Sequence, residues 1–494
     1  MAKESFLLVT LASMASAPPH STRSLRELDR HDSPAGKFVK TNAAPEDRVF
    51  NLYFALAQNN LAALEQKPYA ETLIIFFLRV EELVAPPPDS VSALDSWLSS
   101  LNLMSKAYSP AGDVRSVSLT VKQANQLLDA QYATFVDQKS GVKAVRTLSR
   151  SILVDLKEHI NVVYPTTSFP VPIVGSAKGS TLTRAADSKD VLAAAPQSCA
   201  TSFTLSCTQE LYGIPTTSAT ESSNHLGVIG LSNEWIDNAD LKMFLTKYRP
   251  DLPPSTSCSV VSISGRVNDE STAGPEADLD AQYTIGLASG VPVEFITVGQ
   301  AADDPFDEPF TELIDVMSAT ASHSWVREES PFVLPLAIEV LLAKATQICA
   351  TPLLPWHQAH AHMGGTQDVN PEVAGGVAEL DEGSNSGFSN FFPMPDYQKA
   401  DVTAYQKMLP SSYDGLYNKT SRGYPDVVAR STLIEYVWKG EYSHINGTSA
   451  STPVPASIAA LLNDELVAAG KSPIGFMNPS IYANKGTFND INKW

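Results

Sequence analysis

The segments LGVIGL (226–231), ADLKMFLTKY (239–248), SVVSIS (259–264) and VPVEFITV (291–298) decide the fold. The first is a short apolar run typical of a buried strand, and the third and fourth also predict strands, whereas the second has the period of an amphipathic helix. A further helix is expected to begin at Pro275, between the third and fourth segments. Strands that alternate with helices predict an α/β domain with a mainly parallel sheet.

A separate folded unit is expected upstream of this domain, over residues 18–171. Helical periodicity appears over Arg48–Leu64 and again over Val91–Leu103, and Ser118–Phe135 reads as a strand that enters a helix. Residues 172–199 are small, polar and without a period. We interpret them as a protease-sensitive linker between the two units.

The composition excludes several classes of protein. A chain of 494 residues with 43% hydrophobic residues is long enough for two or three cores and is not a disordered protein. Its net charge of -19 makes nucleic acid a poor partner, because phosphate binding requires clustered Lys and Arg. The same charge fits either simple solubility or a protein kept in an acidic medium.

The N-terminus and the cysteines bear on the compartment. Lys3, the apolar run 6–12 and the small residues 15–17 form a signal-peptide pattern, so residues 1–17 predict secretion to the extracellular medium. No other apolar stretch is long enough to span a bilayer, so no membrane partner is expected. The four cysteines match no zinc pattern and leave open one disulfide, two, or buried thiols.

Ser449 lies just before a predicted helix in INGTSASTPVPASIAALLNDELVAAG (445–470). The helix dipole favours negative charge there, which suits an attacking alkoxide. An ordinary Ser/Thr helix cap explains the same residues and is the simpler interpretation of this segment on its own.

Glu276 and Asp280 in AGPEADLDAQYTIGLASG (273–290) are four residues apart and therefore share one face of a helix. Two such acids can share a proton and act as an acid/base pair, although acids are also simply favoured in a first helical turn. A serine needs a base, and a carboxylate base works best under acidic conditions.

These segments resemble the sedolisin family of serine-carboxyl peptidases. GPEADLDAQY (274–283) is similar to its E-A-x-L-D signature, and NGTSASTP (446–453) to its S-G-T-S-A-S-T-P segment, with Asn446 in place of the first serine. LYGIPTT (211–217), GFSNFFPMPDYQ (387–398) and RGYPDVVA (422–429) also resemble segments of tripeptidyl-peptidase-like members, in the family order.

The resemblance implies a subtilisin-like, parallel-sheet catalytic domain over 200–494, preceded by an α+β propeptide domain. Ser449 would attack the scissile carbonyl of a peptide or protein substrate, Glu276 would be the general base, and Asp280 would hydrogen-bond to Glu276. The activity would be peptide-bond hydrolysis at acidic pH, either tripeptidyl or endopeptidic. The propeptide would inhibit the enzyme until the linker is cut.

The chain departs from the family pattern over 316–363. The family takes a further Asp for its oxyanion hole from an S-G-D motif, and no Asp occurs between Val316 and Gln367. Codons permitted for Trp325–Val340, read with a two-base offset, can encode a family-like segment whose Asp codon straddles Ala337 and Ile338. We interpret the stretch as a shifted reading frame, so a catalytically dead relative or a misassembled gene product is the alternative hypothesis.

The C-terminus departs from the family pattern as well. FNDINKW (488–494) begins like the family's calcium loop, with Asp490 offering a carboxylate and Ile491 a backbone carbonyl, but the later half of the loop is absent. One calcium ion is implied by the resemblance, at a site that is incomplete. An unrelated secreted α/β binding protein is a third hypothesis, which a large distance between Glu276 and Ser449 would favour.

Overall fold

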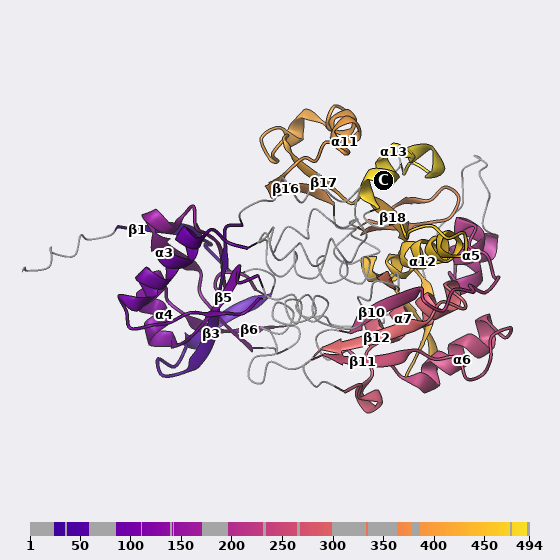
Figure 1. Ribbon diagram of the computed structural model, residues 1–494, viewed down its shortest axis with the longest axis horizontal. Coiled ribbons are helices and arrows are strands. Elements are labelled where there is room, and N and C mark those ends of the chain that lie inside the picture. Colours follow the sequence, from indigo (N-terminus) through magenta and orange to yellow (C-terminus); the bar gives the residue numbers. More distant parts are fainter. Residues whose placement is uncertain are drawn as a thin grey trace, which may run out of the picture.

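The computed structural model describes residues 24–34, 37–58, 85–109, 111–138, 141, 143–169, 196–230, 234–263, 267–298, 332–333, 363–376, 386–474 and 477–491. Figure 1 shows these residues as two folded units, one built from the N-terminal third of the chain and one from the remainder. Across the described ranges, no helix has both the length and the apolar character needed to cross a bilayer.

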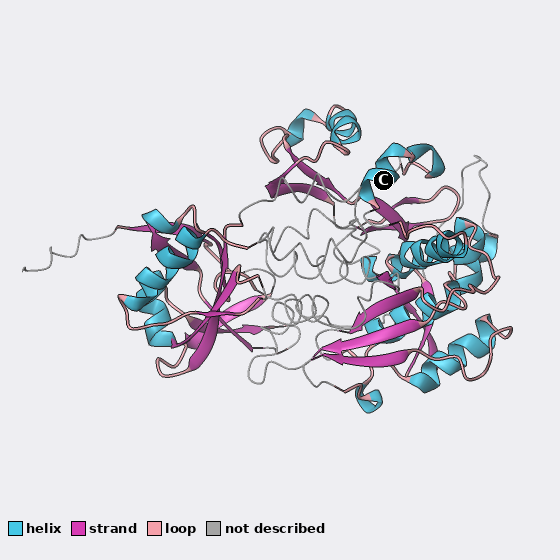
Figure 2. Cartoon of the chain, viewed as in Figure 1, coloured by secondary structure: helices cyan, strands magenta, loops and turns pink. Residues whose placement is uncertain are grey.

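The N-terminal unit is an α+β domain with two main sheets. One sheet has the order β4-β5-β3-β9 and the other β2-β6-β7, while β1 pairs with β8. Helices α3 and α4 pack on this unit (Figure 2). The elements are β1 Leu25–Arg30, β2 Phe38–Ala43, β3 Val49–Leu56, α3 Pro88–Ser99, β4 Lys106–Ala107, β5 Val114–Thr120, α4 Val121–Leu128, β6 Ala133–Asp137, β7 Lys143–Arg146, β8 Ser149–Leu153, η1 Val154–Leu156 and β9 Ile160–Tyr164.

The helix predicted over Arg48–Leu64 is wrong for its described part, which is strand β3. This strand lies between β5 and β9, so residues 52–56 are all buried and the alternation of an exposed strand is lost. A continuous apolar run of this kind cannot be distinguished from a buried helix by its period. The prediction over Val91–Leu103 is confirmed by α3, and the strand entering a helix by β5 and α4.

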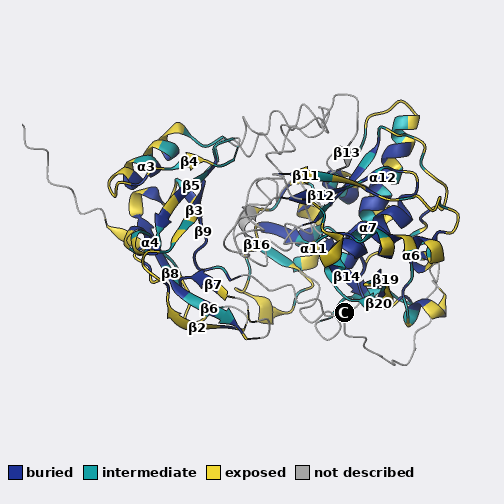
Figure 3. Cartoon of the chain, turned by 90° about the horizontal axis from the view of Figure 1, so that it is seen from below, coloured by how far each residue is buried: buried dark blue, intermediate teal, exposed yellow. Residues whose placement is uncertain are grey.

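The second unit is built around a parallel sheet of order β11-β12-β10-β13. The sequence predicted three of these strands and the helices between them. Helix α7 packs between α6 and α12 and contacts β10 and β12, so almost its whole surface is buried (Figure 3). The bounds are β10 His225–Gly230, α6 Asn238–Tyr248, β11 Ser259–Ile263, η3 Glu270–Thr272, α7 Pro275–Leu287, β12 Val293–Val298, β13 Phe332–Val333 and α12 Pro453–Ala468.

Smaller sheets and helices complete the second unit. Strand β14 pairs with β15 and β18, β16 with β17, and β19 with β20. The bounds are η2 Gln197–Ala200, α5 Leu205–Tyr212, β14 Met363–Gln367, β15 Val373–Ala374, β16 Gly387–Pro393, α11 Lys399–Gln406, η5 Ser411–Tyr413, β17 Ser421–Tyr424, β18 Val427–Arg430, β19 Ile434–Trp438, β20 Glu441–Ile445, η6 Thr448–Ser451, α13 Asn478–Ala483 and η7 Lys485–Thr487.

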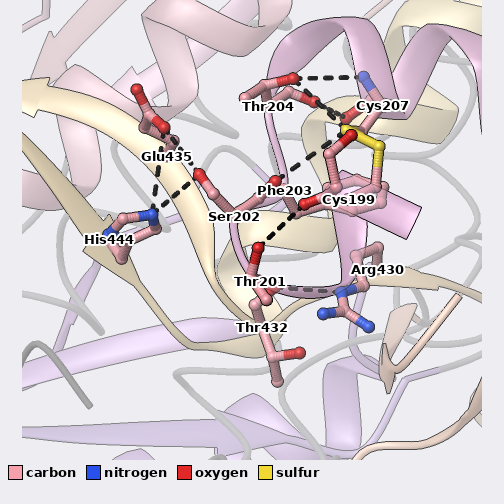
Figure 4. Close-up of a disulfide and its surroundings, with 12 residues drawn as sticks. Cys199, Thr201, Ser202, Phe203, Thr204, Cys207, Arg430, Thr432, Glu435 and His444 are labelled. Atoms are coloured by element: carbon pink, nitrogen blue, oxygen red, sulfur yellow. Dashed lines mark hydrogen bonds and ion pairs between the residues drawn. A yellow bond between two sulfur atoms is a disulfide. The ribbon is translucent and has the colours of Figure 1, made fainter. Parts of the chain in front are cut away.

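The second unit begins a few residues before position 200. Cys199 and Cys207 form a disulfide, which ties η2 to α5 (Figure 4). Phe203 then pairs through its backbone with Ile434 of β19. Of the other two cysteines, Cys258 is a buried free thiol, and Cys349 lies outside the described residues.

We expect loss of this disulfide to lower the free energy of unfolding by about 2 to 3 kcal/mol. The bridge joins residues 8 positions apart, and closing so short a loop restricts the unfolded chain by about that amount. The Cys199→Ser/Cys207→Ser double variant should show this loss in denaturant unfolding. Cys258→Ala serves as a control for the loss of a buried thiol, and an unchanged midpoint for the double variant would contradict the prediction.

Candidate active site

The Ser449 segment is held rigidly at the start of α12. Ser449 lies in the 3-10 turn η6, which contacts β14, β18 and α7 and leads directly into α12. The backbone N–H of Gly447 donates to the carbonyl of Ser431 at 2.9 Å. Ser451 Oγ donates to the carbonyl of Gly364, also at 2.9 Å. These bonds hold the chain on both sides of Ser449.

Glu276 and Ser449 are in contact. Ser449 Oγ donates a hydrogen bond to Glu276 Oε1 at 2.9 Å, across 173 positions of sequence. Both residues are half-buried. The carboxylate accepts a hydrogen bond from the hydroxyl, which is the geometry that a general base requires. A large distance between Glu276 and Ser449 would have favoured an unrelated binding protein, and the observed contact gives that hypothesis no support.

Asp280 lies one helical turn beyond Glu276 on α7 and is half-buried, whereas its neighbours on the helix are fully buried. The amide of Gln282, further along α7, bonds in both directions with the backbone of Val437 on β19, at 2.7 and 2.9 Å. The hydroxyl of Tyr283 donates to the carbonyls of Phe203 and Glu435. The helix that carries both acids is therefore fixed to β19 and to the start of the unit.

Asp278, between the two acids in sequence, is a third carboxyl group near the site and was not singled out from the sequence. It is 1% exposed and accepts a hydrogen bond from the backbone N–H of Asp237 at 2.7 Å. Burial raises the pKa of Asp278 to about 8, aided by the negative charges of Asp240, Asp237 and Glu234. This carboxyl group is therefore protonated at acidic pH and loses its proton near pH 8.

His444, the histidine nearest to Ser449 in sequence, belongs to another cluster. Its Nε2 lies 2.9 Å from Ser202 Oγ, and Ser202 donates to Glu435 at 2.7 Å (Figure 4). Glu435 also pairs with Lys247 at 2.5 Å. Ser202 and Glu435 both lie near the same ring nitrogen, Nε2. In a Ser-His-Asp triad the serine and the acid contact different ring nitrogens, so this cluster is not such a triad.

The two residues expected to bind calcium follow η7 near the end of the described chain. Asp490 is exposed and Ile491 is half-buried. Within the described ranges there is no group of three or more His, Cys, Asp or Glu side chains that could hold a metal. Calcium takes six to eight oxygens, so one carboxylate and one carbonyl do not fit it.

The stretch 316–363 that departs from the family pattern lies outside the described residues, except for the backbone of β13 and for Met363. The missing oxyanion-hole Asp therefore has no structural counterpart among the residues described. Sequencing the transcript across 316–367 decides the reading frame directly.

Comparison with known proteins gives the family. The model of the Pro-kumamolisin activation domain matches residues 36–169. Tripeptidyl-peptidase sed4 of Aspergillus fumigatus is 30% identical over 522 aligned positions, which cover 91% of this chain and 84% of that protein. The chain belongs to the sedolisin family. It is accordingly a serine-type peptidase with an N-terminal propeptide activation domain.

The chain is also similar to a second curated relative and to a solved structure. Tripeptidyl-peptidase SED2 of Arthroderma otae is 27% identical, with 96% of this chain and 88% of that protein covered. Among solved structures, Pseudomonas sedolisin, a serine-carboxyl proteinase complexed with pseudo-iodotyrostatin, covers 55% of this chain at 17% identity. The same alignment covers 84% of that structure, with a TM-score of 0.36.

Proposed function

We propose that this sedolisin-family chain is a serine-carboxyl peptidase that cuts peptides through Ser449, Glu276 and Asp280. The observation that carries the proposal is the hydrogen bond from Ser449 Oγ to Glu276 Oε1 at 2.9 Å. As Ser449 Oγ attacks the scissile carbonyl carbon, its proton passes to Glu276. The C–N bond then breaks and the leaving amine takes that proton, which leaves an acyl-enzyme on Ser449.

The second half of the reaction uses the same groups. Glu276 takes a proton from water, the water oxygen attacks the acyl carbon, and the carboxylic acid product leaves as Ser449 regains its proton. Asp280 is proposed to hold the carboxyl group of Glu276 through a hydrogen bond. Developing negative charge lies at the start of α12, where the helix dipole stabilises it.

Acidic working conditions, secretion and self-inhibition belong to the same proposal. A carboxylate works best as a general base where its conjugate acid forms near the operating pH, which favours an acidic medium. The Cys199–Cys207 disulfide supports the secretory compartment that residues 1–17 predict, because disulfides persist in oxidising environments. The 18–171 unit acts as an inhibitor until the 172–199 linker is cut, and the catalytic domain is subtilisin-like.

The substrate class is taken from the relatives. The Arthroderma otae and Aspergillus fumigatus relatives are both tripeptidyl-peptidases, so we propose that this chain releases tripeptides from peptide N-termini. The test incubates the processed protein at about pH 4 with a free-amino peptide and with the same peptide N-acetylated. Release of a tripeptide from the free peptide alone supports the proposal. Internal cleavage of both peptides indicates an endopeptidase, and no cleavage of either indicates the catalytically dead relative.

A further inference from the structure

We propose that Glu234 is a positioning residue for Glu276, because its carboxylate caps the helix that carries the base. The inference rests on the proposed function, since Glu276 is the base only within that mechanism. Glu234 lies in the connection between β10 and α6, 42 positions before Glu276. No motif in the sequence marks it.

Helix α7 begins without a cap of its own. Its N-cap residue is Gly274, which has no side chain, and Pro275 at the first position has no N–H to donate. An N-cap side chain normally accepts hydrogen bonds from the N–H groups of the second and third positions. At α7 those two groups belong to Glu276 and Ala277, and each donates to Glu234 Oε2, at 3.2 and 3.4 Å.

The glycine at position 274 is explained by the same carboxylate. A Cβ atom on Gly274 would lie 1.7 Å from Glu234 Oε2 and 2.2 Å from its Cδ. The backbone does not require glycine, because φ is -102° and ψ is 152°, a conformation open to any L-residue. The glycine is therefore required by the space that the carboxylate occupies and not by the turn.

The segment that carries Glu234 is itself bound to α7. The N–H of Gly274 donates to the carbonyl of Trp235 at 3.0 Å. The N–H of Asp237 donates to Asp278 Oδ1 at 2.7 Å. Glu234 thus accepts a hydrogen bond from the backbone of Glu276, whose side chain accepts one from Ser449. The segment that carries Glu234 is held in place by the two bonds to α7. A loosened first turn moves Glu276 relative to Ser449, and a misplacement of about 1 Å can cost on the order of 100-fold in rate.

The test uses four variants of the processed protein, with kcat and KM measured at about pH 4. Glu234→Ala should lower kcat about 10- to 100-fold with KM changed less than about twofold, because substrate contacts remain. Glu234→Gln keeps an oxygen that accepts both N–H groups and should restore most of kcat. Gly274→Ala displaces the carboxylate and should resemble Glu234→Ala. The double variant should be no worse than Glu234→Ala alone.

A second readout does not depend on turnover. Amide hydrogen exchange of the peptide that covers the first turn of α7 should be faster in Glu234→Ala and Gly274→Ala than in the parent chain, and should recover in Glu234→Gln. Glu270→Ala, which removes an exposed carboxylate bonded to Asn238 in the same region, is the control and should change neither readout.

The outcomes separate the two proposals. Unchanged kcat and unchanged exchange in Glu234→Ala overturn the role of Glu234, whatever Ser449 does. If the losses of kcat from Glu234→Ala and Gly274→Ala add fully in the double variant, then Gly274 is not required to make room for the Glu234 carboxylate. A parent chain no more active than Ser449→Ala overturns the proposed function instead, while exchange still reports whether Glu234 caps α7.

Discussion

Replacing Ser449 with alanine is expected to lower kcat for peptide hydrolysis on the order of a million-fold. Loss of the nucleophile in a serine peptidase has about this effect, because the acyl-enzyme cannot form. Nothing else in the fold should change, since the Ser449 side chain contributes one half-buried hydrogen bond, to Glu276. The measurement is turnover of the free-amino peptide at about pH 4.

The matched control is Ser457→Ala on helix α12. Ser457 is fully buried, and its Oγ has no hydrogen-bond partner in the described part of the chain, so this change should leave kcat unaltered. Because the Ser449→Ala chain cannot process itself, both chains are cut in trans by the same added peptidase, which is then removed. Equal rates for Ser449→Ala and the parent chain would rule out the proposed mechanism.

Raising the pH from 4 to 8 is expected to cost the second unit up to about 5 kcal/mol of unfolding free energy through Asp278 alone. Its pKa is raised from 3.8 to about 8 in the folded state. The folded chain therefore holds a proton that the unfolded chain releases above pH 4. This contribution to stability is complete below about pH 4 and is lost as the pH rises towards 8.

The Asp278→Asn variant isolates this effect. Asparagine keeps an oxygen for the Asp237 N–H but does not titrate, so the variant should be more stable than the parent at pH 8 and similar at pH 4. Both chains carry Ser449→Ala to prevent self-digestion, and calorimetry follows the transition of the second unit. The groups that face Asp278 are common to both chains, namely Glu234, Asp237, Asp240, Cys258 and Tyr436. Parallel pH profiles would refute the assignment.

The α/β core was predictable because its signals are local. Strands β10 and β12 are short apolar runs, and helix α6, which lies between them in the sequence, has a clear helical period. Strand β3 was not predictable from its period, because burial on both faces removes the alternation that distinguishes a strand from a helix. The local hydrophobic pattern therefore predicted the correct element where one face is exposed to solvent or where the apolar run is as short as a typical strand. It predicted the wrong element for β3, which is longer and lies in the centre of its sheet.

The Ser449–Glu276 contact was predictable only through the family resemblance. The two residues are 173 positions apart, and no spacing rule connects them. Glu234 was missed altogether, although one signal existed. The Gly274-Pro275 start of α7 has neither a capping side chain nor a first N–H, and such a start needs an acceptor from elsewhere in the fold. The sequence could indicate that need but could not say which residue meets it.

The pairing of Phe203 with strand β19 has a consequence for maturation. Phe203 exchanges backbone hydrogen bonds with Leu433 and Glu435, and the disulfide at Cys199 fastens the residues just before it. Every scission upstream of Pro196 leaves these attachments intact. Mature molecules that begin at different residues upstream of Pro196 would therefore have the same active-site structure. The exact position of the processing cut should then not affect catalysis.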